Sequence, residues 1–292
     1  MPVGPRIILT GASGLIGKAL TIRLEQEGYQ VVPLKWRDKA PADFDVGQLE
    51  GAFAVIHLAG EKITQRWTPS ARERILRSRQ EGTSALAETL AKLTLKPPCF
   101  ISMSGLNRYG FRRTELLDEN SPVKVDGFLS EVAAAWENAT AAAESAGIRT
   151  IHLRTGVVLA ASGGALKAML PAFRLGLGGP IGPGTQRLSW IRLGDLVDLI
   201  IWALTQASCR GPLIAIAPQV VTQAEFAREL GRVLRRPAVL PLPAWLISLL
   251  FGDLGRETIL ADLAARPARA LEGGFKFQTP RLAEALPRAL GE

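Results

Sequence analysis

Several residue types are scarce in this chain of 292 residues, which contains two cysteines, two histidines and two tyrosines. Cys99 and Cys209 are too few for a disulfide framework in a chain of this length, and they fit a reducing compartment. No apolar run reaches the roughly 18 residues that cross a bilayer, and the most apolar stretch, Trp245–Phe251, is much shorter. We therefore expect a globular protein with no membrane span and no metal site.

The charge balance is basic, with 35 Lys and Arg against 27 Asp and Glu, a net charge of +8 and a pI near 9.9. Such a balance favours anionic ligands or surfaces in general. The densest basic group is interrupted by Glu73 and Glu81, has no interleaved aromatic residues, and consists of Arg66, Arg72, Arg74, Arg77 and Arg79. We therefore expect a solvated helix face, with one or two arginines directed at ligand phosphates, and no nucleic-acid partner.

The stretch Ile7–Gly17 reads as a buried strand, a glycine turn and the start of a helix. This order is typical of a dinucleotide-binding site, because the helix amino terminus directs unpaired N–H groups and a positive dipole end at phosphates. Gly11 permits the turn, Gly14 permits close approach of a pyrophosphate, and Gly17 permits the helix to pack on the strand. The alternative is a tight strand-to-helix turn that binds no ligand.

The end of the second predicted strand, Tyr29–Leu34, indicates which dinucleotide is preferred. An acidic residue there would hold the ribose 2′-hydroxyl of NAD, but no acid occurs before Asp38. Lys35 and Arg37 could instead pair with a 2′-phosphate, which favours NADP. An exposed basic loop without a ligand is the alternative.

Predicted strands and helices alternate through the first half of the chain, which indicates an α/β fold with a doubly wound parallel sheet of Rossmann type. The expected elements are strands at Ala54–Gly60, Cys99–Met103, Thr150–Leu153 and Val157–Leu159, a short strand near Phe44–Val46, a helix opened by Thr68 and Pro69, and a helix over Phe128–Ala146 with Trp136 on its buried side. A long loop is expected between the stretch ending at Gly110 and that last helix.

The pattern changes after Leu159, where 161–184 is rich in glycine and proline. Further expected elements are a strand at Leu188–Arg192, a helix at Asp195–Thr205, a strand at Pro212–Ala217, a helix opened by the capping box of Thr222 and Glu225, and helical pieces from about 240 onwards. We therefore expect a Rossmann domain over 1–160, completed by about 187–217. A smaller C-terminal α/β substrate lobe would comprise 161–186 and 218–292.

Two polar residues interrupt apolar patterns. His57 lies inside an apolar strand, where a neutral core histidine is favoured over a catalytic base. Arg79 falls on the core-facing stripe of its helix, and burying it without a partner would be costly. Either an anionic ligand or a structural carboxylate would satisfy it.

The motif Thr10–Gly17 resembles the nucleotide motif of the extended branch of the short-chain dehydrogenase/reductase superfamily. Further stretches narrow the resemblance to its atypical epimerase-family group, often labelled sugar-nucleotide epimerase-like. These stretches are His57–Glu61, Ser78-Arg79, Gly82-Thr83, Arg154–Leu159, Phe173–Gly182, Ser189–Ile191, and Gly273–Phe277 with Pro280 in the tail. The resemblance covers nearly the whole chain and implies NADP(H) as cofactor, bound by a Rossmann lobe with a smaller lobe over the nicotinamide end.

By this resemblance, the turn residues hold the pyrophosphate, Lys35 to Arg37 lie at the adenosine-phosphate end, Arg79 faces the cofactor and Val158 lies near the nicotinamide. The implied cofactor-binding set is Gly11, Ser13, Gly14, Leu15, Ile16, Gly17, Lys35, Trp36, Arg37, Leu58, Ala59, Gly60, Arg79 and Val158.

The superfamily's usual catalytic set of Ser, Tyr and Lys is absent, because no Tyr-x-x-x-Lys occurs and the expected tyrosine and lysine positions fall at Phe128 and Val132. Tyr109 is the candidate proton donor and Ser104 the candidate that orients substrate. Packing of a loop is an equal alternative for Tyr109. Trp190 and the glycine-rich loop Gly176–Gly184 would shape the substrate pocket.

The expected function is an NADP(H)-binding oxidoreductase or epimerase-like enzyme that acts on a small carbonyl or hydroxyl substrate. The alternative is a non-catalytic NADP(H)-binding protein with a regulatory or assembly role and a protein partner. The chain leads within six residues into its first strand, so no targeting peptide is expected in it. We expect a cytoplasmic location, or an organelle stroma after removal of a transit peptide.

Overall fold

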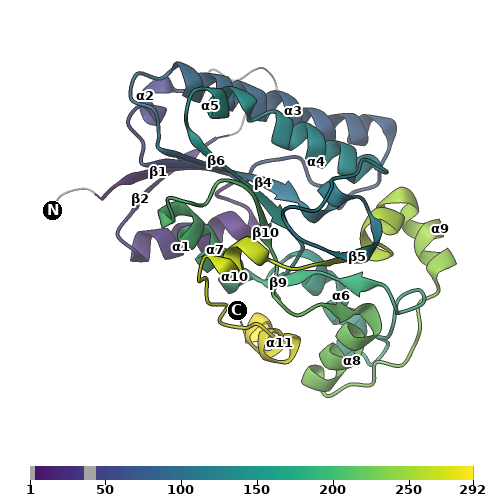
Figure 1. The fold of residues 1–292 in the computed structure, drawn as a ribbon. Coiled ribbons are helices and arrows are strands. Elements are labelled where there is room, and N and C mark those ends of the chain that lie inside the picture. Colours follow the sequence, from purple (N-terminus) through teal and green to yellow (C-terminus); the bar gives the residue numbers. More distant parts are fainter. Residues whose placement is uncertain (1–3, 36–43, 292) are drawn as a thin grey trace. The chain divides into compact units, whose positions relative to one another are not determined.

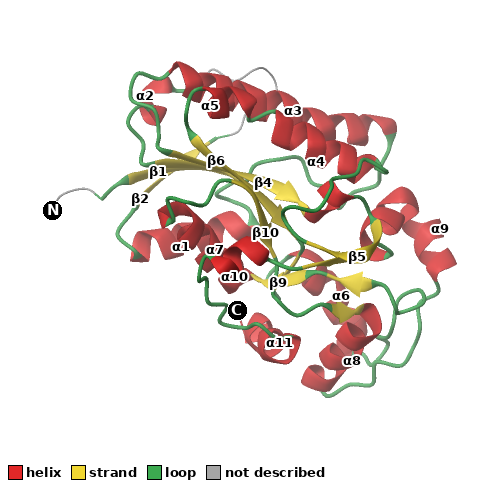
Figure 2. Ribbon diagram, in the orientation of Figure 1, coloured by secondary structure: helices red, strands yellow, loops and turns green. Residues whose placement is uncertain are grey.

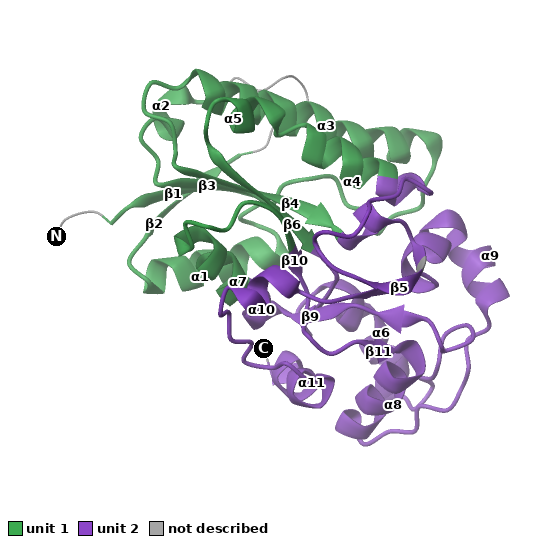
Figure 3. Ribbon diagram, viewed as in Figure 1, with its two compact units in different colours: residues 1–105, 131–154, 197–213 green, residues 106–130, 155–196, 214–292 purple. Residues whose placement is uncertain are grey.

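The computed structural model describes residues 4–35 and 44–291 (Figure 1). Chain contacts divide the protein into two compact units, which Figure 3 shows in different colours. Unit 1 comprises 1–105, 131–154 and 197–213, and unit 2 comprises 106–130, 155–196 and 214–292. Within the described residues, no helix is long and apolar enough to cross a membrane.

A six-stranded sheet forms the centre of unit 1, with the strand order β10-β6-β4-β3-β1-β2. Its strands are β1 (Arg6–Thr10), β2 (Gln30–Leu34), β3 (Ala54–His57), β4 (Cys99–Gly105), β6 (Arg149–Thr155) and β10 (Gly211–Ala215). The strand β1 pairs in parallel with β2 on one side and with β3 on the other. The expected parallel Rossmann-type sheet is therefore confirmed. Because the chain runs outward in both directions from β1, the carboxyl ends of β1 and β3 flank the position where such folds bind ligands.

Helices cover both faces of this sheet, as the red elements of Figure 2 show. They are α1 (Leu15–Gln26), α2 (Val46–Leu49), α3 (Pro69–Lys92), α4 (Phe128–Asn138), α5 (Ala141–Ser145) and α7 (Leu193–Thr205). The helices α3 and α5 lie on one face and α1 on the other (Figure 1). The core under α3 includes Ile8, Leu86 and Phe100, each with no exposed surface. Burial on both faces explains why β1 is apolar at Ile7, Ile8 and Leu9 in succession.

Unit 2 is built from three pairs of short strands and a set of helices. The strands are β5 (Arg112–Leu117) with β12 (Asp262–Ala265), β7 (Val157–Leu159) with β9 (Trp190–Arg192), and β8 (Arg187–Leu188) with β11 (Val221–Thr222). The helices are α6 (Gly164–Arg174), α8 (Gln223–Leu234), α9 (Ala244–Leu254), α10 (Ala268–Glu272), α11 (Leu282–Gly291), a 3-10 turn η1 (Leu106–Tyr109) and a π turn η2 (Gly255–Ile259).

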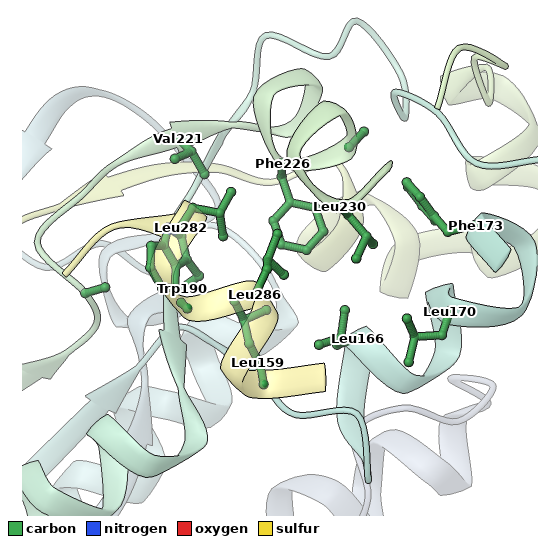
Figure 4. Close-up of a cluster of buried hydrophobic side chains, with 14 residues drawn as sticks. Leu159, Leu166, Leu170, Phe173, Trp190, Val221, Phe226, Leu230, Leu282 and Leu286 are labelled. Carbon is green, nitrogen blue, oxygen red and sulfur yellow. The ribbon is translucent and has the colours of Figure 1, made fainter. Parts of the chain in front are cut away.

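The core of unit 2 joins α6, α8 and α11 around β9 (Figure 4). Trp190 on β9 belongs to the same buried cluster as Phe226 of α8 and Leu286 of α11, and it has no exposed surface. Trp190 is therefore a core side chain, and the expectation that it lines a substrate pocket is wrong.

Several expected elements differ from the structure. The predicted loop before α4 contains β5, and the region from 240 onwards, expected to be helical, contains its partner β12. The expected strand Leu188–Arg192 is two strands in different sheets, and the expected helix Phe128–Ala146 breaks between Asn138 and Ala141. The short strand near Phe44–Val46 is absent from the described residues there, because Val46 begins α2. Pairing between distant segments decides most of these cases, and local periodicity does not encode it.

Candidate dinucleotide site

The turn between β1 and α1 is closed by a hydrogen bond of 3.0 Å from Gly14 N to Gly11 O. Gly11 has φ +71°, and a Cβ on it would lie 2.9 Å from the backbone nitrogen of Ala59. A Cβ on Gly17 would lie 2.2 Å from Gly11 O. Both positions therefore require glycine, for the backbone conformation at Gly11 and for close approach at both.

The amino terminus of α1 leaves its backbone N–H groups open. The helix begins at Leu15 with Gly14 as N-cap, no side chain caps it, and its first turn holds no acidic residue. Ser13 and Gly14 are exposed, whereas Leu15 and Ile16 are half-buried. Open N–H groups and the positive end of the helix dipole make a position suited to a phosphate.

A buried hydrogen-bond network fixes the end of β3 beside this turn. Thr10 Oγ1 accepts hydrogen bonds of 3.2 Å from the backbone nitrogens of both Leu58 and Ala59. The same oxygen lies 2.7 Å from His57 Nδ1, and His57 Nε2 lies 3.0 Å from Thr83 Oγ1. The network holds Leu58 and Ala59 against the glycine turn.

His57 is neutral in this network. Burial, with a smaller contribution from the positive charge of Arg79, lowers the pKa of His57 to about 3. The hydrogen-bond pattern then assigns the ring proton to Nε2, which donates to Thr83, while Thr10 donates to Nδ1. The geometry agrees with the interpretation of His57 as a core histidine.

Arg79 on α3 is 5% exposed and lies between Gly60 and Trp136. Its guanidinium carbon is 4.7 Å from the centroid of the Trp136 ring, a cation–π contact. Its Nη1 donates to the backbone oxygens of Glu61 at 3.0 Å and Ile75 at 3.2 Å. Burial lowers the pKa of Arg79 to about 10, against the opposing effect of Glu61.

Two buried donors at this position are unsatisfied. Arg79 Nε and Trp136 Nε1 have no hydrogen-bond partner among the described residues, and no carboxylate of those residues lies within 4.0 Å of the Arg79 guanidinium. Of the two partners expected for Arg79, the structural carboxylate is therefore missing from the described part of the chain. Oxygen atoms of a dinucleotide would satisfy both donors, so the site fits such a cofactor.

Lys35, expected at the adenosine-phosphate end, is exposed and follows directly after the last residue of β2. Trp36 and Arg37 lie outside the described residues. Because β2 pairs with β1, the carboxyl end of β2 lies at the same edge of the sheet as the glycine turn.

Ser104, near the end of β4, is fixed by a buried ion pair. Its hydroxyl donates to Glu137 Oε1 at 2.9 Å, and Arg154 binds both oxygens of Glu137 at 2.7 Å. Burial alone would raise the pKa of Glu137, but the charge and hydrogen bonds of Arg154 lower it below its usual range. Ser104 is therefore hydrogen-bonded to a carboxylate, that of Glu137, whose position is fixed.

Tyr109 and Val158 belong to unit 2. Tyr109 ends the η1 turn, has no exposed surface and packs with Leu106, Leu117 and Ile216 in a hydrophobic cluster. This environment favours the packing alternative for Tyr109. Val158 lies half-buried in the middle of β7.

The structure thus brings together, within unit 1, the glycine turn, Leu58 to Gly60 and Arg79. Sequence reasoning missed the hydroxyl of Thr10, which ties the turn to β3, and the indole of Trp136, which stacks on Arg79. The sequence predicted that Trp136 lies on the buried side of its helix. It could not predict the contact of Trp136 with Arg79, because the two residues are 57 positions apart in the chain.

Comparisons with known proteins agree with this geometry. Residues 7–216 match the family described as NAD dependent epimerase/dehydratase, and residues 242–289 match a domain of unknown function, DUF1731. The chain is 35% identical to the "Epimerase family protein SDR39U1 homolog, chloroplastic" of Arabidopsis thaliana, over 96% of this chain and 85% of that protein.

Two solved structures are similar as well. The crystal structure of human epimerase family protein SDR39U1 (isoform2) with NADPH has a TM-score of 0.91 and 34% identity, covering 98% of this chain and 99% of that one. The nucleoside-diphosphate sugar epimerase from Corynebacterium glutamicum has a TM-score of 0.79 and 33% identity, covering 99% of this chain and 58% of that one. Sequence and fold therefore agree that this chain belongs to the NAD dependent epimerase/dehydratase family.

Proposed function

We propose that this chain binds NADP(H) at the glycine turn and acts as an oxidoreductase or epimerase-like enzyme on a small carbonyl or hydroxyl substrate. The observation that carries the proposal is the open amino terminus of α1, whose N–H groups are uncapped at a turn that requires glycine at Gly11 and Gly17. The similar human protein crystallised with NADPH supports it.

Each proposed contact follows from the chemistry of the residue. Gly14 and the N–H groups of Leu15 and Ile16 would bind the pyrophosphate. The unsatisfied donors of Arg79 and Trp136 would take oxygen atoms of the same molecule. Lys35, with Trp36 and Arg37, would bind the adenosine 2′-phosphate. Ser13, Leu58, Ala59, Gly60 and, from unit 2, Val158 complete the proposed set.

NADP(H), when bound, supplies hydride exchange at its nicotinamide ring. The proton-handling residues of this chain are proposed to be Ser104, held by Glu137, and Tyr109. Ser104 would orient a substrate hydroxyl by accepting its hydrogen, because the hydrogen of Ser104 itself already points to a carboxylate. Tyr109 would exchange a proton only after leaving its hydrophobic cluster.

A non-catalytic NADP(H)-binding protein, with a regulatory or assembly role and a protein partner, is the second candidate. The full burial of Tyr109 favours it, together with the absence of Tyr-x-x-x-Lys from the sequence. For either function we propose a cytoplasmic or stromal location, in line with the chloroplastic relative. We also propose that 1–160 with 187–217 acts as the cofactor domain and the remainder as the substrate lobe.

A fluorescence titration tests the cofactor. We expect NADPH to bind at least tenfold more tightly than NADH, and Lys35→Glu to reduce that preference, because the variant carries a repelling charge beside the 2′-phosphate. Lys62→Glu is the matched control, since it makes the same charge change on an exposed residue outside the proposed set. Equal affinity for both cofactors would refute the NADP assignment.

A hydride-transfer screen separates the two functions. With carbonyl substrates and NADPH, we expect turnover in the wild type and a loss of at least a hundredfold in Tyr109→Phe. Full activity in Tyr109→Phe would remove Tyr109 from the mechanism. Tight NADPH binding with no turnover of any substrate would favour the non-catalytic protein.

A further inference from the structure

A pocket lies wholly within unit 2, between α8 and the segment that follows it. Its volume is about 450 Å³, in the range of small-molecule sites, and it is lined by Pro180, Ala224, Arg228, Arg232, Arg236, Ala238 and Val239. None of these residues belongs to the proposed cofactor-binding or proton-handling set. Three arginines in one pocket make it a concentrated site of positive charge.

The packing of α8 places these arginines. Phe226 and Leu230 point into the core of unit 2 (Figure 4). Arg228 and Arg232 lie one turn apart on the opposite, exposed face of the helix. They therefore face solvent together, about 6 Å apart at their Cβ atoms.

An unusual backbone turn at the end of α8 places the third arginine, Arg236. Arg235 ends α8 in the left-handed region, with φ +54° and ψ +44°, and it is the only non-glycine residue with positive φ in the described part of the chain. The turn lets Arg236 N donate to Gly231 O at 2.9 Å. Arg236 is thereby brought back alongside the last turn of the helix, and strain of this kind is frequent at functional sites.

The acidic residues of α8 form a direct ion pair with one of the three arginines, Arg232. Glu225 accepts from the backbone and side chain of Thr222, and Glu229 pairs with Arg232 at 2.5 Å. No carboxylate of the described residues lies within 4.0 Å of Arg228 or Arg236. Both guanidinium groups can therefore donate to an external anion.

We propose that this pocket binds a soluble ligand that carries two or more phosphate groups. The guanidinium groups of Arg228, on α8, and Arg236, after it, suit phosphate oxygens, which arginine binds in pairs, while Arg232 adds donors beyond those that Glu229 occupies. The small apolar side chains of Ala224, Ala238 and Val239, with Pro180, form the rest of the wall and accommodate the carbon part of such a ligand.

Isothermal titration of the full-length protein with inorganic triphosphate tests the proposal. When saturating NADPH occupies the glycine turn, we expect one triphosphate site per chain, with a single Kd. Arg228→Ala/Arg236→Ala is expected to raise that Kd at least tenfold. The control, Arg281→Ala/Arg288→Ala, removes the same charge from exposed residues at α11 and is expected to change the Kd less than twofold.

Two results of the titration would overturn the proposal. They are no triphosphate binding by the wild type saturated with NADPH, and an equal loss of binding in both double variants. Vesicles containing phosphatidylglycerol test a lipid as the source of phosphate. Vesicle binding that excess triphosphate displaces would place a lipid headgroup in this pocket and would overturn the assignment of a soluble ligand. Thermal unfolding of each variant confirms that the protein compared is folded.

Discussion

At the residue scale, the glycines of the first turn have two separable roles. Gly17 faces protein, since a Cβ there would lie 2.2 Å from Gly11 O and 2.7 Å from Ala12 Cα. Gly14 faces outward, and a Cβ there would meet only Gly11 O, at 3.2 Å. Gly17 therefore matters for the stability of the fold, and Gly14 matters for the approach of a ligand.

We expect Gly17→Ala to lower the free energy of unfolding by about 2 kcal/mol, because backbone atoms must move to admit the methyl group. Gly14→Ala is expected to cost about 1 kcal/mol, from the poorer N-cap, and to weaken NADPH binding at least tenfold. Urea unfolding and NADPH titration of both variants measure these effects. The assignment fails if Gly14→Ala binds NADPH as tightly as the wild type.

His57 makes stability depend on pH. Its folded pKa, about 3, lies below the ordinary value of 6.5, so the unfolded chain takes up a proton at higher pH than the folded chain does. The stabilisation is complete above about pH 7 and is lost progressively as the pH falls towards 3. Between pH 7 and pH 5 this one residue is expected to remove about 2 kcal/mol.

Urea unfolding at several pH values checks this expectation. In His57→Gln the titrating group is gone, so the decline between pH 7 and pH 5 should be about 2 kcal/mol smaller than in the wild type. The variant is expected to be less stable at pH 7, because the geometry of the Thr10 and Thr83 hydrogen bonds changes. An identical pH dependence in the two proteins would contradict a buried neutral histidine.

At the scale of the element, the end of α8 trades stability for the position of Arg236. A non-glycine residue in the left-handed conformation costs about 1 kcal/mol relative to glycine. We therefore expect Arg235→Gly to raise the free energy of unfolding by about 1 kcal/mol, measured by urea unfolding. A destabilised variant would show that the Arg235 side chain contributes contacts that outweigh the strain.

Capping signals in the sequence correctly predicted where two helices begin. The capping box of Thr222 and Glu225 opens α8, and Thr68 with Pro69 opens α3. Each signal involves side chains within three or four residues of the backbone groups they satisfy. The apolar stretch of β1 and the glycine turn after it could also be predicted, because they too are local signals.

Elements that depend on partners distant in the chain could not be predicted from the sequence. The pairing of β5 with β12 joins Arg112 to Asp262, and neither strand has an alternating apolar pattern of its own. The site shows the same limit. The Gly11 and Gly17 positions followed from a motif, whereas the stacking of Trp136 on Arg79 and the fixing of Ser104 by Glu137 and Arg154 depend on the folded chain.

At the scale of the whole molecule, each of the two units contains a hydrophobic cluster of its own. One cluster, around Leu86 and Phe100, lies entirely in unit 1. Another, around Trp190, Phe226 and Leu286, lies entirely in unit 2. A unit with its own core can unfold as its own cooperative block, so ligand binding to one unit need not stabilise the other.

We therefore expect NADPH to protect the two units unequally from hydrogen exchange. All proposed cofactor residues except Val158 belong to unit 1, so at 100 times Kd the slowest amides of β1 and β3 should exchange about a hundredfold more slowly. The slowest amides of α8 and α11 should change less than threefold. Mass spectrometry of peptides from each unit measures both rates. Equal protection throughout would show that the chain unfolds as one block, in spite of its separate cores.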